Sequence, residues 1–216
     1  MYTVNLKKKI LDANEEAAFK NSRLFHQYKI KCLNVISSPG SGKTTILSRT
    51  IEALKGKIKI GVVEGDLKTD LDTQKIKKTG AAAIQIETNG ACHLSAEQVY
   101  EALQNLPLAK LNLVFIENVG NLVCPSDFVL GEHGRVVVLS TAEGDDKPAK
   151  YPSTFAKADI LLINKIDLLG NVDFDTSRVR ADALKLNKNL KIFEISAKTA
   201  AGLQNWYDYL LGFVAG

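Results

Sequence analysis

The chain has 216 residues, 45% of them hydrophobic, which is enough for one well-buried domain and too little for two large ones. Its 28 basic and 24 acidic residues give a net charge of +4, too small for the basic stripe that nucleic-acid binding needs. No apolar run is long enough to span a bilayer and no signal peptide is evident, so we expect no membrane role and a cytoplasmic location.

The first 30 residues are expected to form a helix that packs on the rest of the chain. Apolar residues recur at helical spacing among polar ones: Leu6, Ile10, Ala17, Leu24 and Phe25. We assign this segment no chemistry. The predicted division is an amphipathic helix within residues 1–30 and one larger domain at residues 31–216.

From residue 31 onward, short apolar segments alternate with helix-like segments. The apolar segments are residues 31–37, 58–63, 82–86, 111–116, 135–139, 160–163 and 191–195. Such alternation builds βαβ units around a mostly parallel sheet buried on both faces. Residues 141–153 are polar and predict a long loop, whereas Trp206, Tyr207 and Leu210 predict a helix face that closes the core.

Residues 37–44 read SSPGSGKT between the first predicted strand and a helix-like segment. Glycine lets backbone N–H groups approach phosphate oxygens, and the helix N-terminus adds positive charge. Lys43 supplies a charge for the outer phosphates, and Thr44 offers a hydroxyl to the Mg²⁺ that accompanies a triphosphate. The general pattern has glycine where this chain has Ser37. We predict a phosphate-binding loop whose contacts come from Ser38, Gly40, Ser41, Gly42, Lys43, Thr44 and Thr45.

This loop narrows the predicted fold class. An α/β chain with a phosphate-binding loop after its first strand is typical of P-loop NTPases. We therefore predict a three-layer sandwich, with a mostly parallel sheet of about seven strands flanked by helices.

A second motif predicts the base. NKID, with Asn164, Lys165 and Asp167, directly follows an apolar segment. The Asp167 carboxylate can accept two hydrogen bonds from the ring N–H and amino group of guanine, a pair that adenine lacks, which gives discrimination on the order of 10⁴-fold. Lys165 would lay its stem along the base. The opposite side of the ring would be closed by the SAK sequence after the last predicted strand: Ser196, Ala197 and Lys198. We predict GTP and GDP as ligands.

Two carboxylates are candidates for holding Mg²⁺. Asp66 and Glu117 each follow an apolar segment, which places them near the edge of the sheet where ligands bind. Either can hold Mg²⁺ directly or through water, although a solvent-facing acid is an equal alternative for each alone. Gly120 would let a backbone N–H approach the terminal phosphate, so the segment from Glu117 is a candidate switch.

Hydrolysis of GTP is expected to be slow. Asn121 stands where small signalling GTPases place a water-orienting glutamine, and no arginine finger is evident. Lys147 could reach the phosphates of a facing subunit as a weak substitute, and a solvated lysine is at least as good an explanation. The predicted catalytic residues are Lys43, Thr44, Asp66 and Glu117.

Two cysteines and a histidine form a candidate transition-metal site. Cys92 is followed by His93, and Cys124 comes seven residues after Glu117. Thiolate and imidazole suit Ni²⁺, Zn²⁺ and copper better than Mg²⁺, and three ligands leave a position for water or a partner. Because Cys124 follows the candidate switch, a phosphate-driven change would move a ligand. Cys32 lies in the first predicted strand and is expected to be a buried core thiol.

In this order, SSPGSGKTT, EGD, CHLSAE, ENVGNLVCP, EGDDKPAKYP and NKID resemble the HypB family of nickel-insertion GTPases, which act in the maturation of nickel–iron hydrogenases. The likeness runs from residue 35 to the C-terminus and also accounts for the serine at position 37. CHL together with ENVGNLVCP is its most specific part. The related urease GTPase UreG carries a different Cys-Pro-His metal motif and a different switch sequence.

The resemblance implies a homodimer that brings Cys92, His93 and Cys124 of both subunits together, with GTP in each subunit. It also implies that nickel passes to the hydrogenase large subunit with the help of the small zinc protein HypA. Many family members carry an N-terminal cysteine motif or a histidine-rich tract. Residues 1–30 contain no cysteine and only His26, so we expect the GTPase-domain site alone to bind nickel or zinc.

Other functions stay open on the sequence. A urease-type nickel GTPase shares the nucleotide motifs, and a regulatory GTP-binding module would keep Cys92 and Cys124 as ordinary buried thiols. A small-molecule kinase would need a substrate lid, often rich in arginine. The arginine cluster, Arg178 and Arg180, instead falls in a helix-like segment after the base motif.

Overall fold

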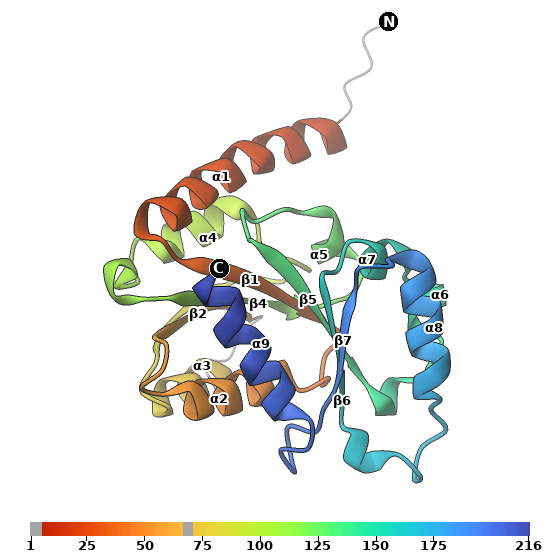
Figure 1. Cartoon of the computed structure of the whole chain (residues 1–216). Coiled ribbons are helices and arrows are strands. Elements are labelled where there is room, and N and C mark those ends of the chain that lie inside the picture. The colour runs from red at the N-terminus through yellow and green to blue at the C-terminus, as the bar shows by residue number, and fades with distance from the viewer. Residues whose placement is uncertain (1–5, 67–70) are drawn as a thin grey trace, which may run out of the picture.

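The computed structural model describes residues 6–66 and 71–216 of the chain (Figure 1). Within these residues, seven parallel strands form one sheet in the order β3-β2-β4-β1-β5-β6-β7. The strands are β1 (Lys31–Ser37), β2 (Ile60–Asp66), β3 (Ala82–Glu87), β4 (Leu113–Gly120), β5 (Gly134–Ser140), β6 (Ile160–Asn164) and β7 (Lys191–Glu194). Each predicted apolar segment is confirmed as a strand, with ends that differ by at most four residues.

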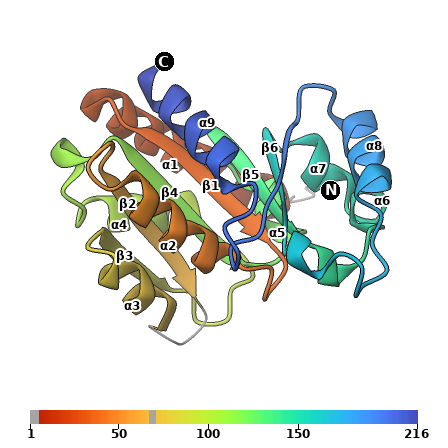
Figure 2. The ribbon, with the colours of Figure 1, turned by 60° about the horizontal axis from the view of Figure 1, so that its bottom comes forward.

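Helices cover both faces of the sheet and form the outer layers of a sandwich (Figures 1 and 2). One face carries α2 (Lys43–Leu54), α3 (Leu71–Lys78) and α9 (Leu203–Ala215). The other carries α1 (Leu6–Tyr28), α4 (Ala96–Leu103), α7 (Pro152–Ala156) and α8 (Thr176–Leu186). Side chains alternate between these layers, since Val136 packs toward the first face and Val137 toward the second. The predicted α/β sandwich is confirmed.

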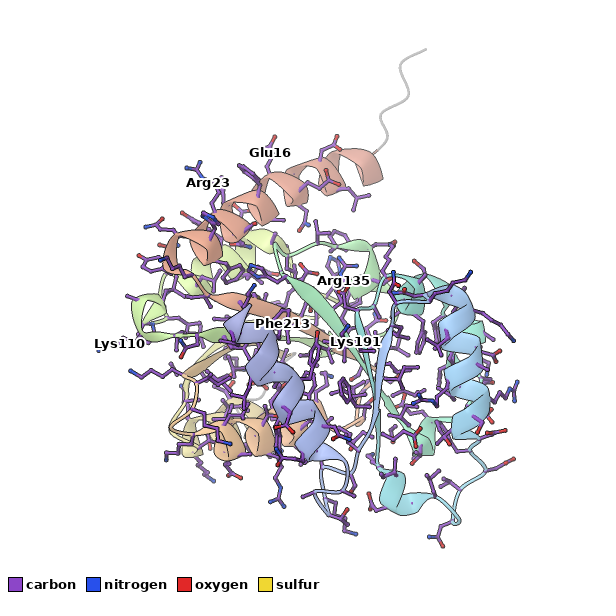
Figure 3. The ribbon with its side chains drawn as sticks, in the orientation of Figure 1. Glu16, Arg23, Lys110, Arg135, Lys191 and Phe213 are labelled. Atoms are coloured by element: carbon purple, nitrogen blue, oxygen red, sulfur yellow. The ribbon has the colours of Figure 1, made fainter. Side chains whose placement is uncertain are left out.

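Helix α1 crosses the outside of the second face and packs against α4. Its buried residues share one side of the helix: Asn14, Ala18, Asn21 and Phe25. The Asn21 amide donates hydrogen bonds to the carbonyl oxygens of Ala96 and Leu130, at 2.8 and 3.0 Å. Glu16 and Arg23 project from the opposite side into solvent (Figure 3). The division of the chain into this helix and a separate G domain stays a prediction.

The predicted loop at residues 141–153 was wrong. The segment contains the 3₁₀ turn η2 (Thr141–Glu143), the short helix α6 (Lys147–Lys150) and the start of α7. Ser140 and Glu143 form a reciprocal capping box, and Pro148 and Pro152 stand in the first turns of α6 and α7. Polar and proline residues were interpreted as loop formers, whereas here they begin helical turns.

Helix α9 closes the core as predicted. Trp206 and Leu210 are fully buried, Tyr207 is half-buried, and the indole N–H of Trp206 donates to the Thr50 hydroxyl at 3.0 Å. Among the residues that the structure describes, no helix is both long and apolar enough to cross a membrane.

Candidate functional site

The phosphate-binding loop lies between β1 and α2, near the middle of the sheet. Gly40 and Gly42 have φ angles of +73° and +98°, a left-handed conformation that favours glycine. A Cβ atom on Gly42 would lie only 2.6 Å from Nδ2 of Asn164. Glycine at position 42 is therefore required both by the backbone and by a neighbouring side chain.

The lysine of this loop is buried beneath it. Nζ of Lys43 donates a hydrogen bond to Oγ of Ser37 at 2.9 Å, so the serine that departs from the general pattern holds the lysine in place. Burial lowers the pKa of Lys43 by disfavouring the charged ammonium, while the nearby Glu117 carboxylate opposes this. A bound phosphate would supply further negative charge to this partly desolvated cation.

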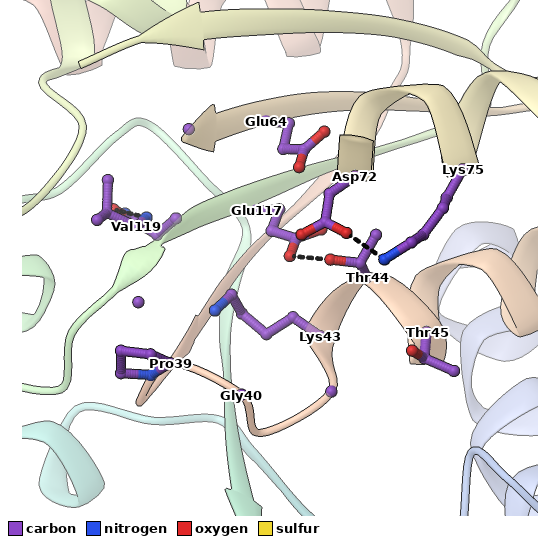
Figure 4. Close-up of a pocket in the computed structure, with 14 residues that line it drawn as sticks. Pro39, Gly40, Lys43, Thr44, Thr45, Glu64, Asp72, Lys75, Glu117 and Val119 are labelled. Carbon is purple, nitrogen blue, oxygen red and sulfur yellow. Dashed lines mark hydrogen bonds and ion pairs between the residues drawn. The ribbon is translucent and has the colours of Figure 1, made fainter. Parts of the chain in front are cut away.

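Two of the three predicted magnesium ligands, Thr44 and Glu117, meet at the start of α2 (Figure 4). Oγ1 of Thr44 donates to Oε1 of Glu117 at 2.8 Å, and both residues are buried. Glu64 lies beside Glu117 in the sheet register and accepts a hydrogen bond from Thr73 at 2.5 Å. A hydroxyl and carboxylates are the hard oxygen donors that suit Mg²⁺. The side chain of Asp66 lies outside the described residues, so its predicted role stays a prediction.

A cavity of about 410 Å³ opens beside these ligands (Figure 4). The phosphate-binding loop forms one side, and the ends of β2 and β4 with α3 form the other. From α3, Asp72 and Lys75 form an ion pair at 2.6 Å. Gly120 lies close to the loop, because a Cβ atom there would be 3.0 Å from Cα of Pro39. The cavity thus has the surroundings expected for the outer phosphates and Mg²⁺.

Asn164 joins the phosphate side of the site to the predicted base pocket. Its Nδ2 donates to the carbonyl oxygen of Ser41 at 2.8 Å, and its Oδ1 accepts from the N–H of Ala197 at 3.1 Å. Because Asn164 is 1% exposed, these bonds are shielded from water. One buried amide therefore fixes NKID and SAK relative to the phosphate-binding loop.

The two other polar side chains of NKID, Lys165 and Asp167, are also held by hydrogen bonds. Lys165 has a left-handed backbone, with φ of +64°, and its Nζ donates to the carbonyl oxygen of Gly40 at 2.8 Å. Its stem therefore extends from the end of β6 to the phosphate-binding loop. Oδ1 of Asp167 accepts a hydrogen bond from Oγ of Ser196 at 2.5 Å, which orients the carboxylate. Lys198 is exposed beside this group.

Sequence analysis missed Glu143, which also belongs to this site. Oε1 of Glu143 accepts from Oγ of Ser41 at 2.6 Å and from the N–H of Ser140 at 3.1 Å. The capping pattern from Ser140 to Glu143 could have revealed the local turn. Nothing in the sequence places this turn against the phosphate-binding loop.

The three predicted transition-metal ligands lie together. Cys92 and His93 come from the connection between β3 and α4, and Cys124 begins the short helix α5 (Cys124–Asp127). One ligand atom from each residue lies within 4.8 Å of the others. Cys92 is exposed, whereas His93 and Cys124 are half-buried. The His93 ring stacks on Phe128 with the ring centroids 3.8 Å apart.

Hydrogen bonding and burial shift the pKa values of Cys92 and His93. The pKa of Cys92 is raised, first by its hydrogen bond with Cys124 and then by desolvation. Burial lowers the pKa of His93, which keeps the imidazole in the neutral form that binds metal. Two sulfur atoms and an imidazole suit Ni²⁺ or Zn²⁺. Cys32 is fully buried, and burial raises the pKa of its thiol, so its assignment to the core is confirmed.

A family model described as "CobW/HypB/UreG, nucleotide-binding domain" matches residues 31–194. The hydrogenase maturation factor HypB of Rhizobium leguminosarum bv. viciae is 47% identical over 207 residues, which cover 96% of this chain and 69% of that protein.

Two solved structures are similar in both sequence and fold. HypB from Helicobacter pylori in complex with nickel has a TM-score of 0.90 and 39% identity, covering 94% of this chain and 95% of that one. The hydrogenase maturation factor HypB from Archaeoglobus fulgidus has a TM-score of 0.89 and 39% identity, covering 94% of this chain and all of that one.

Proposed function

Because this chain belongs to the CobW/HypB/UreG family, and within it to the hydrogenase maturation factors named HypB, we propose that it couples GTP hydrolysis to nickel delivery during hydrogenase maturation. One observation carries the coupling. The ligand atoms of Cys92, His93 and Cys124 lie within 4.8 Å of one another, and Cys124 follows the strand that carries Glu117 and Gly120 by only four residues.

The chain is a GTPase whose specificity resides at the ends of β6 and β7. Asp167, oriented by Ser196, would accept two hydrogen bonds from guanine, while the stem of Lys165 would cover the base. Adenine would leave the carboxylate unpaired. The buried bonds of Asn164 support this assignment because they hold the base motif against the phosphate-binding loop.

Magnesium and the phosphates would be held at the ends of β1, β2 and β4. Lys43 would contact the outer phosphates, and Thr44, Glu117 and Asp66 would hold Mg²⁺ directly or through water. When bound, the ion neutralises charge that develops on the transferred phosphoryl group. Turnover stays slow because Asn121 replaces the usual glutamine and no arginine is found in the lining of the phosphate cavity as the structure describes it.

The nickel cargo would bind to Cys92, His93 and Cys124. With GTP and Mg²⁺ bound, the segment after Glu117 would close on the terminal phosphate and shift Cys124, and hydrolysis would release it. The close approach of Gly120 to Pro39 supports this, since the end of β4 already touches the phosphate-binding loop.

The metal site also indicates which partners the chain binds. Three ligands leave room for a fourth, so we propose that two copies of the chain pair through this surface and that GTP favours the pairing. A HypA-type zinc protein and the hydrogenase large subunit would be the other partners in nickel transfer. We place the protein in the cytoplasm because reduced thiols at Cys92 and Cys124 need a reducing compartment.

The test is a Ni²⁺ titration of the untagged full chain by calorimetry, once with GDP and once with a nonhydrolysable GTP analogue. The two nickel affinities should differ by about 5- to 150-fold, the usual range of coupling between sites. Size-exclusion chromatography of the same samples should show a larger dimer fraction with the GTP analogue.

Two variants and one control complete this test. Cys92→Ala and Cys124→Ala should lose high-affinity nickel binding, whereas Cys32→Ala should retain it because that thiol lies in the core. Equal nickel affinity in the two nucleotide states would refute the coupling. Undiminished nickel binding by both site variants would show that nickel binds at other residues. No nickel binding by the unmodified chain would instead favour a regulatory GTP-binding module without a transition metal.

A further inference from the structure

Leu94, the residue after His93, is fixed to the nucleotide side of the molecule. Its backbone N–H donates to Oδ1 of Asn118 at 3.1 Å, and its side chain is completely buried. Asn118 immediately follows Glu117 in β4. The loop that carries two metal ligands is therefore bonded to the strand that carries a predicted magnesium ligand.

The side chain of Leu94 makes a second contact with the nucleotide side. A Cβ atom on Gly65 would lie 2.8 Å from both Cγ and Cδ2 of Leu94, so the leucine packs directly on this glycine. Gly65 stands between Glu64 and Asp66 in β2, and it lines the phosphate cavity. Leu94 thus contacts both strands whose ends carry the predicted magnesium carboxylates.

The buried side chain of Asn118 hydrogen-bonds to both Leu94 and Val119. It is 1% exposed, and its Oδ1 accepts from the N–H of Val119 at 3.0 Å as well as from Leu94. Its Nδ2 donates to Oδ1 of Asn34 at 3.3 Å. Val119 also lines the phosphate cavity (Figure 4). One buried amide therefore bonds to the backbone beside the cavity and to the backbone beside His93.

We propose that Asn118 and Leu94 are positioning residues that couple the state of the nucleotide to the position of His93. The proposal rests on the proposed function and adds a second route to it. Cys124 would follow the end of β4 through the chain itself, whereas His93 would follow it through the Asn118 hydrogen bond. Two of the three nickel ligands would then respond to the same strand.

Close packing explains why a small movement should be transmitted. The side chain of Leu94 is closely packed, because it lies directly against the backbone of Gly65. Breaking the Asn118 bond would leave the buried N–H of Leu94 without an acceptor, so the loop and the strand are expected to move together.

The experiment compares nickel affinities between nucleotide states rather than within one. Ni²⁺ is titrated into the full-length Asn118→Ala variant with GDP and with a nonhydrolysable GTP analogue. The ratio of the nickel affinities in the two nucleotide states should be about threefold or more closer to one than in the unmodified chain. This loss of coupling is expected because the lost bond is buried. A purely structural role would weaken both affinities alike and leave the ratio unchanged.

Two controls isolate the Leu94 contact. Asn34→Ala removes the bond that Asn118 donates but keeps the acceptor for Leu94, so its ratio should stay near that of the unmodified chain. Thr50→Val removes a buried hydrogen bond to Trp206 far from the metal loop and reports the effect of general destabilisation. Thermal melting of each variant confirms that it is folded at the titration temperature.

A milder variant covers the case in which Asn118→Ala does not fold. Leu94→Val keeps the backbone N–H bonded to Asn118 and loosens the contact with Gly65, so it should lower the ratio by a smaller factor. If the unmodified chain shows the same nickel affinity in both states, the proposed function itself is wrong. If that chain shows coupling and the folded variants retain it in full, only the role of Asn118 and Leu94 is wrong.

Discussion

The nucleotide side and the metal side of this molecule are built differently. Ser37, Asn164 and Ser196 are at most 1% exposed, and each hydrogen-bonds to another part of the nucleotide site. On the metal side Cys92 is exposed, and its carbonyl oxygen accepts a 3.4 Å hydrogen bond from the half-buried Asn121. The nucleotide side is thus held by buried hydrogen bonds, whereas the metal side has one exposed ligand, Cys92, and two half-buried ones, His93 and Cys124.

This difference matches what each ligand has to do. A nucleotide that drives a switch must be recognised selectively, which buried and preorganised donors and acceptors provide. A metal cargo must be taken up and given away, which requires ligands that a partner can reach. We therefore expect substitutions on the nucleotide side to reduce GTP binding or hydrolysis by larger factors than substitutions on the metal side reduce nickel binding, provided that the three metal ligands stay intact.

The largest effect is expected for Asp167→Asn. An amide offers only one acceptor where guanine presents two donors, so GTP affinity should fall on the order of 10³-fold. Nucleotide titration with a fluorescent GTP analogue measures it. Asp173→Asn, an exposed carboxylate in the following loop, is the matched control and should bind normally. Unchanged GTP affinity in Asp167→Asn would remove the basis for guanine specificity.

A second large effect is expected for Glu117→Gln. The substitution weakens the carboxylate that faces Thr44, so the GTP hydrolysis rate at saturating nucleotide should fall about 10²-fold, with a higher Mg²⁺ requirement. Phosphate release measured across a Mg²⁺ series tests this. Glu87→Gln, at the exposed end of β3, should hydrolyse GTP at the normal rate. A normal rate in Glu117→Gln would assign the metal to other carboxylates.

A smaller effect is expected on the metal side for Phe128→Ala. Its ring stacks on His93, and loss of such a contact should weaken Ni²⁺ binding by about 3- to 10-fold. Calorimetry with GDP present measures the change, and GTP affinity should stay within experimental error. Phe19→Ala removes a ring that is 66% exposed on α1 and serves as the control. A nickel affinity equal to that of the control would mean that stacking does not orient His93.

The smallest effect is expected for His133, which lies away from both sites at the opposite end of the sheet. The quantity affected there is the pH dependence of folding stability. Nδ1 of His133 accepts from the N–H of Cys32 at 3.0 Å, and burial, followed by the charge of Lys31, lowers the pKa of His133. The folded chain therefore binds fewer protons than the unfolded chain just below the unfolded pKa of about 6.5, so stability falls as the pH drops through that window.

Replacement of His133 by asparagine tests this pH dependence. His133→Asn keeps an acceptor but cannot titrate, so it should lose less stability than the unmodified chain between neutral pH and pH of about 5.5. Urea unfolding at the two pH values gives the comparison, and solvent screening keeps the difference small. An identical pH dependence in the two chains would show that His133 does not contribute.

The sheet could be predicted because its evidence is local. Each apolar segment predicts a strand. The position of the nucleotide site then follows from the rule that ligands bind at the carboxyl ends of parallel strands. The phosphate-binding loop and NKID were likewise recognisable from contiguous residues. The actual contact between Cys92 and Cys124 depends on strand order, because β3 and β4 are separated by β2 in the sheet.

Contacts between distant segments could not be predicted in the same way. Glu64 directly follows the apolar segment 58–63 but was missed, because its place beside Glu117 appears only when β2 pairs with β4. Asn118 stood next to a recognised carboxylate, yet its partner Leu94 is 24 residues away. The stacking of Phe128 on His93 depends on the path of two connections that carry no pattern of their own.

The tight contact at Gly42 limits how this chain can change through evolution. Any larger residue there would push the Asn164 amide away, and that amide anchors both the NKID segment and the SAK segment. A single substitution would thus damage triphosphate binding and selection of the base in one step. A larger residue at this position could not improve one half of the pocket without disturbing the other.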